Sequence, residues 1–332
     1  FHAAQVQPVV KVETMAGVQC WRKSIGIEKV GLYIPGGSAP LFSTVLMLGI
    51  PAMLAGCKEI VLCTPPGKDG TIHPAVLYAA KAAGITQIYK AGGAQAIAAM
   101  AYGTERIPAV YKIFGPGNQY VTCAKQLVQR DGIVIDMPAG PSEVCVLADE
   151  TANAAYVAAD LLSQAEHGSD SQVLLVSTSA AMTEKVIKEK RNQLAALQRK
   201  DIAAKALANS KAIVMENITD ALALVNAYAP EHLIISCAND EAVAEMVVNA
   251  GSVFLGSYSP ESVGDYASGT NHTLPTNGYA KAYSGVSVDS FVKKITYQKL
   301  TQEGLKNIAS TVVSMAEAEG LQAHANAVKV RL

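Results

Sequence analysis

The sequence predicts an α/β protein with two Rossmann-like, incomplete parallel-sheet domains and a helical C-terminal tail. Short β-rich runs alternate with Ala-rich stretches of helical length, the pattern of βα units on parallel sheets. The alternation pauses at the hinge-like segment 137–143 and then restarts, which predicts a second, separate sheet. From about residue 290 apolar residues recur at helical spacing, which predicts the tail.

The composition is that of a well-packed soluble enzyme with more than one domain. The chain has 332 residues, of which 50% are hydrophobic and 17% charged, and its formal net charge is −1. This charge provides no basic field for nucleic acid or anionic lipid, so we expect neither partner. The longest apolar stretch, 41–56, is too short to span a bilayer and contains Pro51. Six scattered cysteines without a CxxC pair favour a reducing, cytoplasmic location and argue against a thiolate zinc site.

The individual elements follow from this alternation. In the first half, strands are predicted at 30–34, 59–63, 87–89, 111–114 and 133–135, and helices at 40–48, 74–83, 95–101 and 119–129. In the second half, strands are predicted at 143–147, 172–177, 212–216, 232–236 and 252–255, with helices between them.

The tail is predicted to consist of two helical stretches that flank Gly320, with no strand after about residue 290. Apolar side chains recur at helical spacing at Leu305, Ile308, Val312 and Met315, and Phe291 and Ile295 form a similar pair upstream. Such a stripe must pack on something, and a partner subunit is one candidate.

Two histidine motifs could carry chemistry. Gln164 and His167 stand three residues apart at the end of a predicted helix, so an amide oxygen and an imidazole could converge on a zinc ion. This segment by itself favours the other interpretation, a polar helix end with a solvated histidine. Glu231 and His232 precede a predicted strand and could share acid/base work if the backbone turns at Pro230, or could form an ordinary loop.

Two further segments hold residues of the same types. The polar segment 257–277 reads as a long irregular loop and contains Asp265 and His272, which suit metal binding and substrate contact. Glu319 and His324 place another carboxylate and imidazole around the helix break near the C-terminus.

Glycine-rich turns bear on nucleotide binding. The turns at 33–38 and 115–120 each follow a predicted strand and open a helix, a geometry that suits anions. Neither completes GxGxxG, because the first lacks the spacing and Tyr120 stands where the second needs its last glycine. These residues by themselves indicate nucleotide-compatible turns and no more.

Seven segments, in their order along the chain, resemble the histidinol dehydrogenase family. They cover nearly the whole sequence and are VGLYIPGG (30–37), GPGNQYV (115–121), DMPAGPSEV (136–144), LLSQAEHG (161–168), APEHL (229–233), VGDYASGTNHTLPT (263–276) and EAEGLQAHANAV (317–328). The family begins with a substantial helical N-terminal segment, and this chain is expected to begin beyond it.

The resemblance implies roles for the residues found above. It implies one zinc ion per subunit, held by Gln164, His167, Asp265 and His324. It implies Glu231 and His232 as the acid/base pair. The substrate contacts that it implies are these zinc ligands, the acid/base pair, and Ser142, His272 and Glu319. The NAD contacts that it implies are Tyr33, Gln95 and Asn118.

The resemblance also implies a reaction and an assembly. L-Histidinol would be oxidised to L-histidine through bound L-histidinaldehyde with two NAD+ and water, in L-histidine biosynthesis. Zinc would orient the substrate, His232 would be the general base and Glu231 would activate water. The protein would be a homodimer whose tail completes the site of the other subunit, so that Glu319 and His324 act in trans.

The expected domains are residues 1–30, an N-terminal remnant packing on the second α/β domain; 31–140, the first α/β domain, which binds NAD; 141–286, the second α/β domain with the zinc and catalytic residues; and 287–332, the tail. Three alternatives stay open: a dehydrogenase of a different amino alcohol or sulfonated alcohol, a non-catalytic metal-binding or assembly protein, and a fragment without activity by itself. The presence of both Glu231 and His232 beside four candidate ligands argues against the second.

Overall fold

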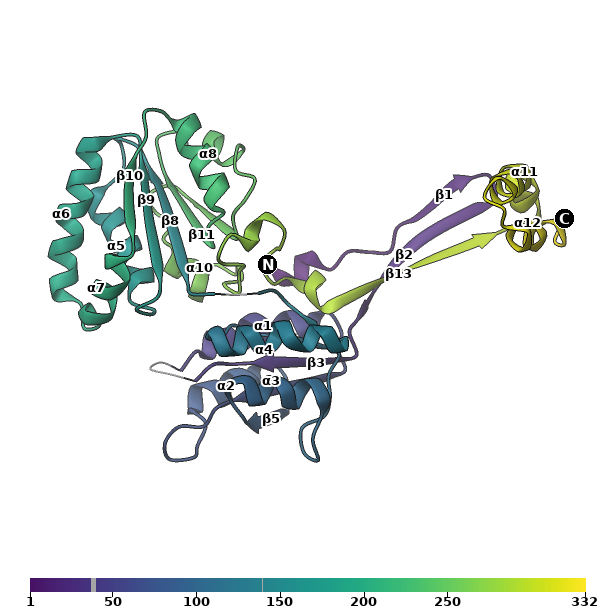
Figure 1. Cartoon of the computed structure of the whole chain (residues 1–332), viewed down its shortest axis with the longest axis horizontal. Helices are drawn as coiled ribbons and strands as arrows, with labels where there is room; N and C mark the ends of the chain where they lie inside the picture. The colour runs from purple at the N-terminus through teal and green to yellow at the C-terminus, as the bar shows by residue number, and fades with distance from the viewer. Residues whose placement is uncertain (37–39, 139) are drawn as a thin grey trace.

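Two five-stranded parallel sheets and a projecting arm make up the chain (Figure 1). The computed structural model describes residues 1–36, 40–138 and 140–332. Gly37 and Ser38 of the first glycine-rich turn, and Ala139 of the 136–144 motif, lie outside the described residues. No helix within the described ranges is long and apolar enough to span a bilayer.

The first sheet has the strand order β5-β4-β3-β6-β7, and all its pairs are parallel. Its strands are β3 (Lys29–Tyr33), β4 (Glu59–Thr64), β5 (Gln87–Lys90), β6 (Lys112–Phe114) and β7 (Val134–Ile135). Helices α1 (Phe42–Leu54) and α2 (Pro74–Ala82) cover one face, and α3 (Gly93–Tyr102) and α4 (Gln119–Val128) cover the other. A short 3-10 turn, η2 (Gln129–Asp131), follows α4. Every strand and helix predicted for this half is confirmed in type.

Helix α1 continues past the predicted end at residue 48 because the structure tolerates Pro51 inside it. Proline has no backbone N–H, so the carbonyl of Met47, one turn earlier, loses its helical donor. The side chain of Asn271 donates to that carbonyl at 2.7 Å. A residue from the 257–277 segment thus completes the helix, and the prediction that α1 ends at 48 is wrong for that reason.

The second sheet has the order β10-β9-β8-β11-β12 and is also entirely parallel. Its strands are β8 (Glu143–Ala148), β9 (Gln172–Ser177), β10 (Lys211–Val214), β11 (His232–Ser236) and β12 (Ser252–Leu255). Helices α5 (Ala154–Ala165), α6 (Ala180–Ala196) and α7 (Lys200–Ala208) cover one face, and α8 (Ile218–Tyr228) and α9 (Asp240–Ala244) cover the other. The predicted strands agree with these bounds to within two residues.

Both sheets share one topology. Counted in chain order within each sheet, the strands lie in the order 3-2-1-4-5, which is the doubly wound arrangement without its sixth strand. The expected pair of incomplete Rossmann-like units is therefore confirmed. The seven-residue connection 136–142 joins the carboxyl end of β7, at the edge of the first sheet, to the amino end of β8, the central strand of the second.

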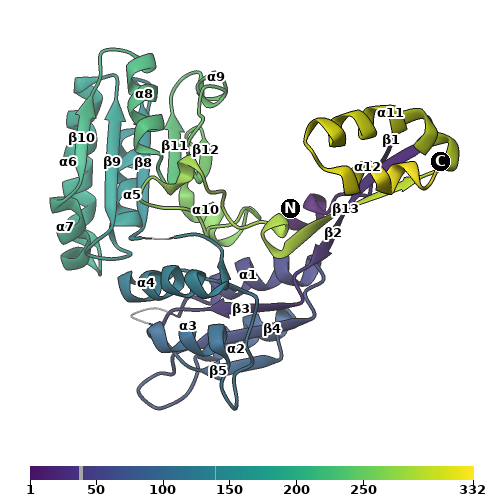
Figure 2. The same ribbon diagram turned by 45° about the vertical axis from the view of Figure 1, so that its right-hand side comes forward.

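The arm is an antiparallel sheet that carries two helices at its far end (Figures 1 and 2). Strand β2 (Val18–Gly26) lies between β1 (Lys11–Met15) and β13 (Val292–Leu300), and helices α11 (Gln302–Ala318) and α12 (Gln322–Lys329) follow. The helical tail is confirmed, but the expectation of no strand after residue 290 is wrong. Strand β13 is exposed over most of its length, so it has no buried face to impose a two-residue apolar period.

Residues before the arm connect it to the rest of the chain. The 3-10 turns η1 (His2–Gln5) and η4 (Val288–Phe291) adjoin α1, and the Gln5 side chain accepts a hydrogen bond from the backbone N–H of Val288 at 3.0 Å. The Nε2 atom of His2 lies 3.4 Å from the side-chain nitrogen of Asn271. The division of the chain into four domains, and the packing of residues 1–30 on the second α/β unit, stay predictions.

The sequence predicts that the 257–277 segment is an irregular loop, and this prediction is wrong in part. The segment contains a short helix, α10 (Glu261–Tyr266), and a further 3-10 turn, η3 (Tyr279–Lys281), follows it. Glu261 and Asp265 stand four residues apart on α10 and therefore share one of its faces. The helix lies beside the lower end of the second sheet in Figure 2.

Candidate functional site

The Glu231–His232 pair stands at the amino end of strand β11. Helix α8 ends in a left-handed residue, Ala229 (φ 56°), and the chain turns through Pro230 before it enters the strand at His232. The Glu231 carbonyl accepts a hydrogen bond from Ser252 at 2.9 Å, which ties this turn to the start of β12. Glu231 is 7% exposed and His232 4%, and Glu231 Oε2 lies 3.6 Å from His232 Nδ1. The turn predicted at Pro230 does bring both side chains to one place.

The backbone of Glu143, the first residue of β8, holds both members of this pair. Its N–H donates to Glu231 Oε2 at 2.8 Å, and its carbonyl oxygen lies 3.0 Å from His232 Nδ1. Because a carbonyl can only accept, Nδ1 carries the hydrogen in this contact. The other ring nitrogen, Nε2, is buried and has no hydrogen-bond partner among the described residues. His232 is therefore oriented with Nε2 available for proton transfer.

Several carboxyl groups in this region are buried, which alters their pKa values. Desolvation raises the pKa of Glu143 to about 7, against the hydrogen bond from Asn277. Desolvation also raises the pKa of Glu261 to about 8, although the charge of His232 opposes this. For His232, desolvation lowers the pKa, but the negative charges of Glu231 and Glu261 prevail and raise it to about 10. A cation next to Glu261 would offset that negative charge and bring the pKa of His232 back down.

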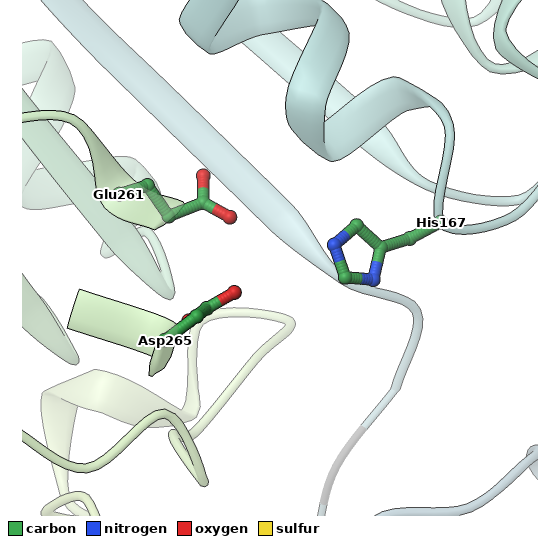
Figure 3. A group of neighbouring side chains, drawn as sticks. All are labelled: His167, Glu261 and Asp265. Carbon is green, nitrogen blue, oxygen red and sulfur yellow. The ribbon is translucent and has the colours of Figure 1, made fainter. Parts of the chain in front are cut away.

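A candidate metal centre lies beside the pair. His167, just beyond the end of α5, and Glu261 and Asp265 on α10 each offer one ligand atom, and these atoms lie within 4.8 Å of one another. Figure 3 shows the three side chains pointing toward a common point. Glu261 is buried, Asp265 half-buried and His167 exposed. Imidazole nitrogen and carboxylate oxygen are ligands that suit Zn²⁺.

Gln164 connects the candidate metal centre to the Glu231–His232 pair. Its side chain is 1% exposed and lies between Glu261 and the backbone of Glu143. In the amide orientation that satisfies both neighbours, its nitrogen donates to Glu261 Oε1 at 2.5 Å and its oxygen accepts from the Glu143 N–H at 3.2 Å. Because the same N–H also donates to Glu231, a continuous chain of hydrogen bonds runs from Glu261 to Glu231.

The donor set fits a divalent cation. The Oε2 atom of Glu261 is buried and has no hydrogen-bond partner among the described residues, although it stands beside His167 and Asp265. A buried carboxylate oxygen without a partner is costly, and a cation would remove that cost.

The residues predicted to contact substrate divide into two groups. His272 lies near the cluster: its Nε2 atom is 3.2 Å from Ser43 Oγ, and its pKa is lowered by desolvation while the charge of Asp265 opposes this. Ser142 directly precedes Glu143, and its carbonyl accepts a hydrogen bond from Gln172 at 3.1 Å. These two positions adjoin the acid/base pair or the metal centre.

Glu319 and His324 form the second group. Within a single chain, the helices that carry them lie away from His167, Glu261 and Asp265. Glu319 caps the end of α11 and His324 lies on α12, and both are exposed. These helices stand at the far end of the arm, away from the second sheet (Figures 1 and 2).

The residues predicted to contact NAD lie around the carboxyl ends of the first sheet. Tyr33 is the last residue of β3, and its hydroxyl accepts a hydrogen bond from the Gly93 N–H at 3.1 Å, at the start of α3. Gln95 is exposed on α3. Asn118 caps α4 by accepting from the N–H groups of Tyr120 and Val121, both at 3.1 Å. Strands β3 and β6 form the switch point of the sheet, where nucleotides bind in doubly wound folds.

Two residues of the candidate site, Glu143 and Glu261, were not predicted from the sequence. Glu143 acts through its backbone, which no side-chain pattern reveals. Glu261 lies in the 257–277 segment, whose composition predicts an irregular loop, and an irregular loop has no face on which carboxylates would gather. The four-residue spacing of Glu261 and Asp265 was the available signal, since that spacing on a helix places two carboxylates on one face.

The two halves of the molecule suit different parts of one reaction. Buried carboxylates around an imidazole serve proton transfer, and the switch point of a doubly wound sheet serves a nucleotide. Together they fit one class of protein, an α/β oxidoreductase with two parallel sheets. Comparison with known proteins then matches residues 1–332 to the family described as histidinol dehydrogenase. The chain belongs to the histidinol dehydrogenase family and is an enzyme.

Individual relatives agree. The chain is 66% identical to the histidinol dehydrogenase of Bacteroides thetaiotaomicron over 332 residues, which are 100% of this chain and 78% of that protein. The crystal structure of histidinol dehydrogenase from Elizabethkingia anophelis superimposes with a TM-score of 0.98 at 61% identity, covering 99% of this chain and 76% of that one.

A more distant likeness concerns the fold alone. The γ-glutamyl phosphate reductase of Thermotoga maritima has a TM-score of 0.53 at 13% identity, over 90% of this chain and 78% of that one.

Proposed function

We propose that the protein oxidises L-histidinol to L-histidine in histidine biosynthesis, through bound L-histidinaldehyde and with two NAD+ and one water. Membership of the histidinol dehydrogenase family supports the substrate and the pathway. One structural observation carries the chemistry: a metal-ligand group and an oriented acid/base pair are joined by the hydrogen bonds of Gln164. NAD+, when bound, accepts the hydride of each oxidation.

The zinc ligands in this proposal are Gln164, His167 and Asp265, with His324 of the partner subunit. Zinc, when bound, serves as a template that holds an imidazole-bearing amino alcohol. The convergence of His167, Asp265 and the unpartnered Oε2 atom of Glu261 supports the site. We assign Glu261 the role of balancing the charge of the ion and of holding the amide of Gln164.

In the first oxidation His232 removes the hydroxyl proton of the substrate at its Nε2 atom. The contact between Nδ1 and the Glu143 carbonyl supports this role, because it leaves Nε2 as the acceptor in the neutral imidazole, the form that a cation beside Glu261 favours. In the second oxidation Glu231 takes a proton from the water that adds to the aldehyde carbon. Its position next to His232 supports a shared site for both steps.

The site is completed by a second copy of the chain in this proposal. Glu319 and His324 stand on an arm that points away from the cluster of its own subunit. The arm exposes large apolar side chains on its strands and helices, among them Val12, Met15, Met315 and Leu321. Exposed apolar groups gathered on one element favour an interface. We therefore propose a homodimer in which the arm of each subunit brings these two residues to the other.

The experiment that tests the function is metal analysis of the purified protein combined with the ratio of NADH formed to histidinol consumed. We expect close to one zinc per chain and two NADH per histidinol. A ratio of one, or oxidation of imidazole-free amino alcohols at the same kcat/KM, would contradict the proposal. The latter outcome would favour a dehydrogenase of a different alcohol with the same metal site.

A further inference from the structure

A buried ion pair in the first α/β unit takes no part in the chemistry proposed above. Lys125 on α4 and Asp136, which directly follows β7, pair through Nζ and Oδ1. Their side chains are 3% and 1% exposed, respectively. Charged groups so deeply buried are rare unless they are fully paired and hydrogen-bonded. The contacts of this pair indicate which part of the molecule it holds.

The hydrogen bonds of the pair go to the backbone of two loops. Asp136 Oδ2 accepts from the Gly115 N–H at 2.8 Å, and Asp136 Oδ1 accepts from the Met137 N–H at 2.7 Å. Lys125 Nζ donates to the carbonyl of Gly115 at 2.8 Å and to that of Met137 at 3.2 Å. Both backbone polar groups of Gly115 and both of Met137 are thus held by one ion pair.

Gly115 begins the turn that leads to Asn118. It has a φ of +127°, and a Cβ atom at this position would lie 2.0 Å from the carbonyl oxygen of Tyr33. The turn therefore presses against the carboxyl end of β3, at the switch point of the sheet. At its other end Asn118 caps α4. The ion pair and this cap leave the turn little freedom to move.

Met137 begins the connection to the second sheet. Five residues further on, Ser142 precedes Glu143, whose backbone holds Glu231 and His232. The ion pair thus joins the turn at the end of β6 to the segment that leads to the acid/base pair. A nucleotide that binds at this turn needs the turn to be held in its binding geometry before it arrives, so such a connection has a use.

We propose that Lys125 and Asp136 are positioning residues for the nucleotide. They hold the Gly115–Asn118 turn against Tyr33 and fix it relative to the connection toward Glu143. This rests on the proposed contacts of Tyr33 and Asn118 with NAD. A pair that merely stabilised the fold would affect binding of both substrates alike, or neither.

The test uses Lys125→Met and Asp136→Asn, which remove one charge each and change the side-chain volume little. The matched control is Val45→Ala, a fully buried residue of α1 on the opposite face of the same sheet. We expect KM for NAD to rise about tenfold or more in both pair variants, with kcat, KM for histidinol and zinc content changing less than about twofold. A KM for NAD no higher than in Val45→Ala would overturn the proposal.

Hydrogen exchange of the metal-loaded dimer provides a second measurement that does not depend on turnover. The amides of Gly115 and Met137 should exchange at least about tenfold faster in Asp136→Asn than in Val45→Ala. Unchanged exchange there would overturn the positioning role whatever the kinetics. If the wild type reduces no NAD with histidinol, the proposed function fails, and this measurement still decides whether the pair holds the turn.

Discussion

The Nδ1 atom of His232 lies 3.0 Å from the backbone carbonyl oxygen of Glu143, across the adjacent strands β11 and β8. This contact assigns a hydrogen to Nδ1, while Nε2 is buried and has no hydrogen-bond partner among the described residues. The backbone N–H of Glu143 donates to the side chain of Glu231. One residue at the amino end of β8 therefore sets the orientation of both Glu231 and His232.

Replacing His232 tests its role as the base. His232→Asn should lower kcat for histidinol by about 10²–10⁴-fold, because the amide cannot take the hydroxyl proton. Zinc content should be unchanged, since His232 is not among the proposed ligands. His73→Asn is the control: His73 caps α2 with its side chain, and asparagine also caps helices well. A kcat within threefold of the wild type would exclude His232 as the base.

Glu231→Gln should separate the two oxidations. The amide oxygen can still accept the hydrogen bond from Glu143, so the local structure should be retained. Water activation needs the carboxylate, and the aldehyde step should slow by about 10²–10³-fold while the alcohol step slows much less. Single-turnover measurements with supplied histidinol and with supplied histidinaldehyde give the two rates. Equal losses in both would rule out a specific role in water activation.

Mixed dimers test whether the arm acts in trans. His324→Ala and His232→Asn should each be nearly inactive alone. Co-expressed, they form mixed dimers in which one of the two sites combines an intact His232 with an intact His324 of the partner subunit. Random pairing should therefore restore about a quarter of wild-type activity. No recovery in a preparation shown to contain mixed dimers would place both residues of each site on one chain.

Asp160 predicts a pH dependence of stability. Burial raises the pKa of this α5 carboxyl to about 7 in the folded chain, above its ordinary value of 3.8. The folded state therefore holds the proton more tightly, and the stabilisation from it, complete below about pH 4, is lost as the pH rises through 7. Asp160→Asn should raise the free energy of unfolding at pH 8 by at least about 1 kcal/mol and change it little at pH 4.

Denaturant unfolding at the two pH values checks this, with Asp201→Asn as the control, an exposed aspartate in the first turn of α7. An equal effect of Asp160→Asn at both pH values would contradict the assigned pKa.

Gly115→Ala should be severely destabilising. The alanine Cβ would lie 2.0 Å from the Tyr33 carbonyl oxygen, and the φ of +127° is unfavourable for any other residue. We expect a loss of about 3 kcal/mol or more, or insoluble protein. Gly132→Ala is the matched control, because Gly132 also has a positive φ (+88°) but its Cβ would meet open space. Gly132→Ala should lower the free energy of unfolding by only about 1 kcal/mol. Comparable losses in the two variants would show that the positive φ, and not the contact with the Tyr33 carbonyl, causes the destabilisation.

The central strands of the two parallel sheets could be predicted because they pack their faces against helices. β8 is buried along its whole length, and its run of apolar residues marks it as a central strand without reference to anything else. The arm strands gave no such signal. β1 is exposed at every position, and β13 pairs with β2 from the other end of the chain. Pairing of exposed strands far apart in sequence leaves no local pattern.

The candidate site, like the fold, was predictable from the sequence only in part. The sequence alone determined the residue types of the family motifs, including Gln164, His167, Asp265 and the Glu231–His232 pair. Only the tertiary structure decided that Glu261 joins them, that the Glu143 backbone orients the pair, and that Lys125 and Asp136 hold the Gly115 turn. The physical reason is that motifs record which side chains a site needs, whereas backbone hydrogen bonds and burial arise only when distant strands come together.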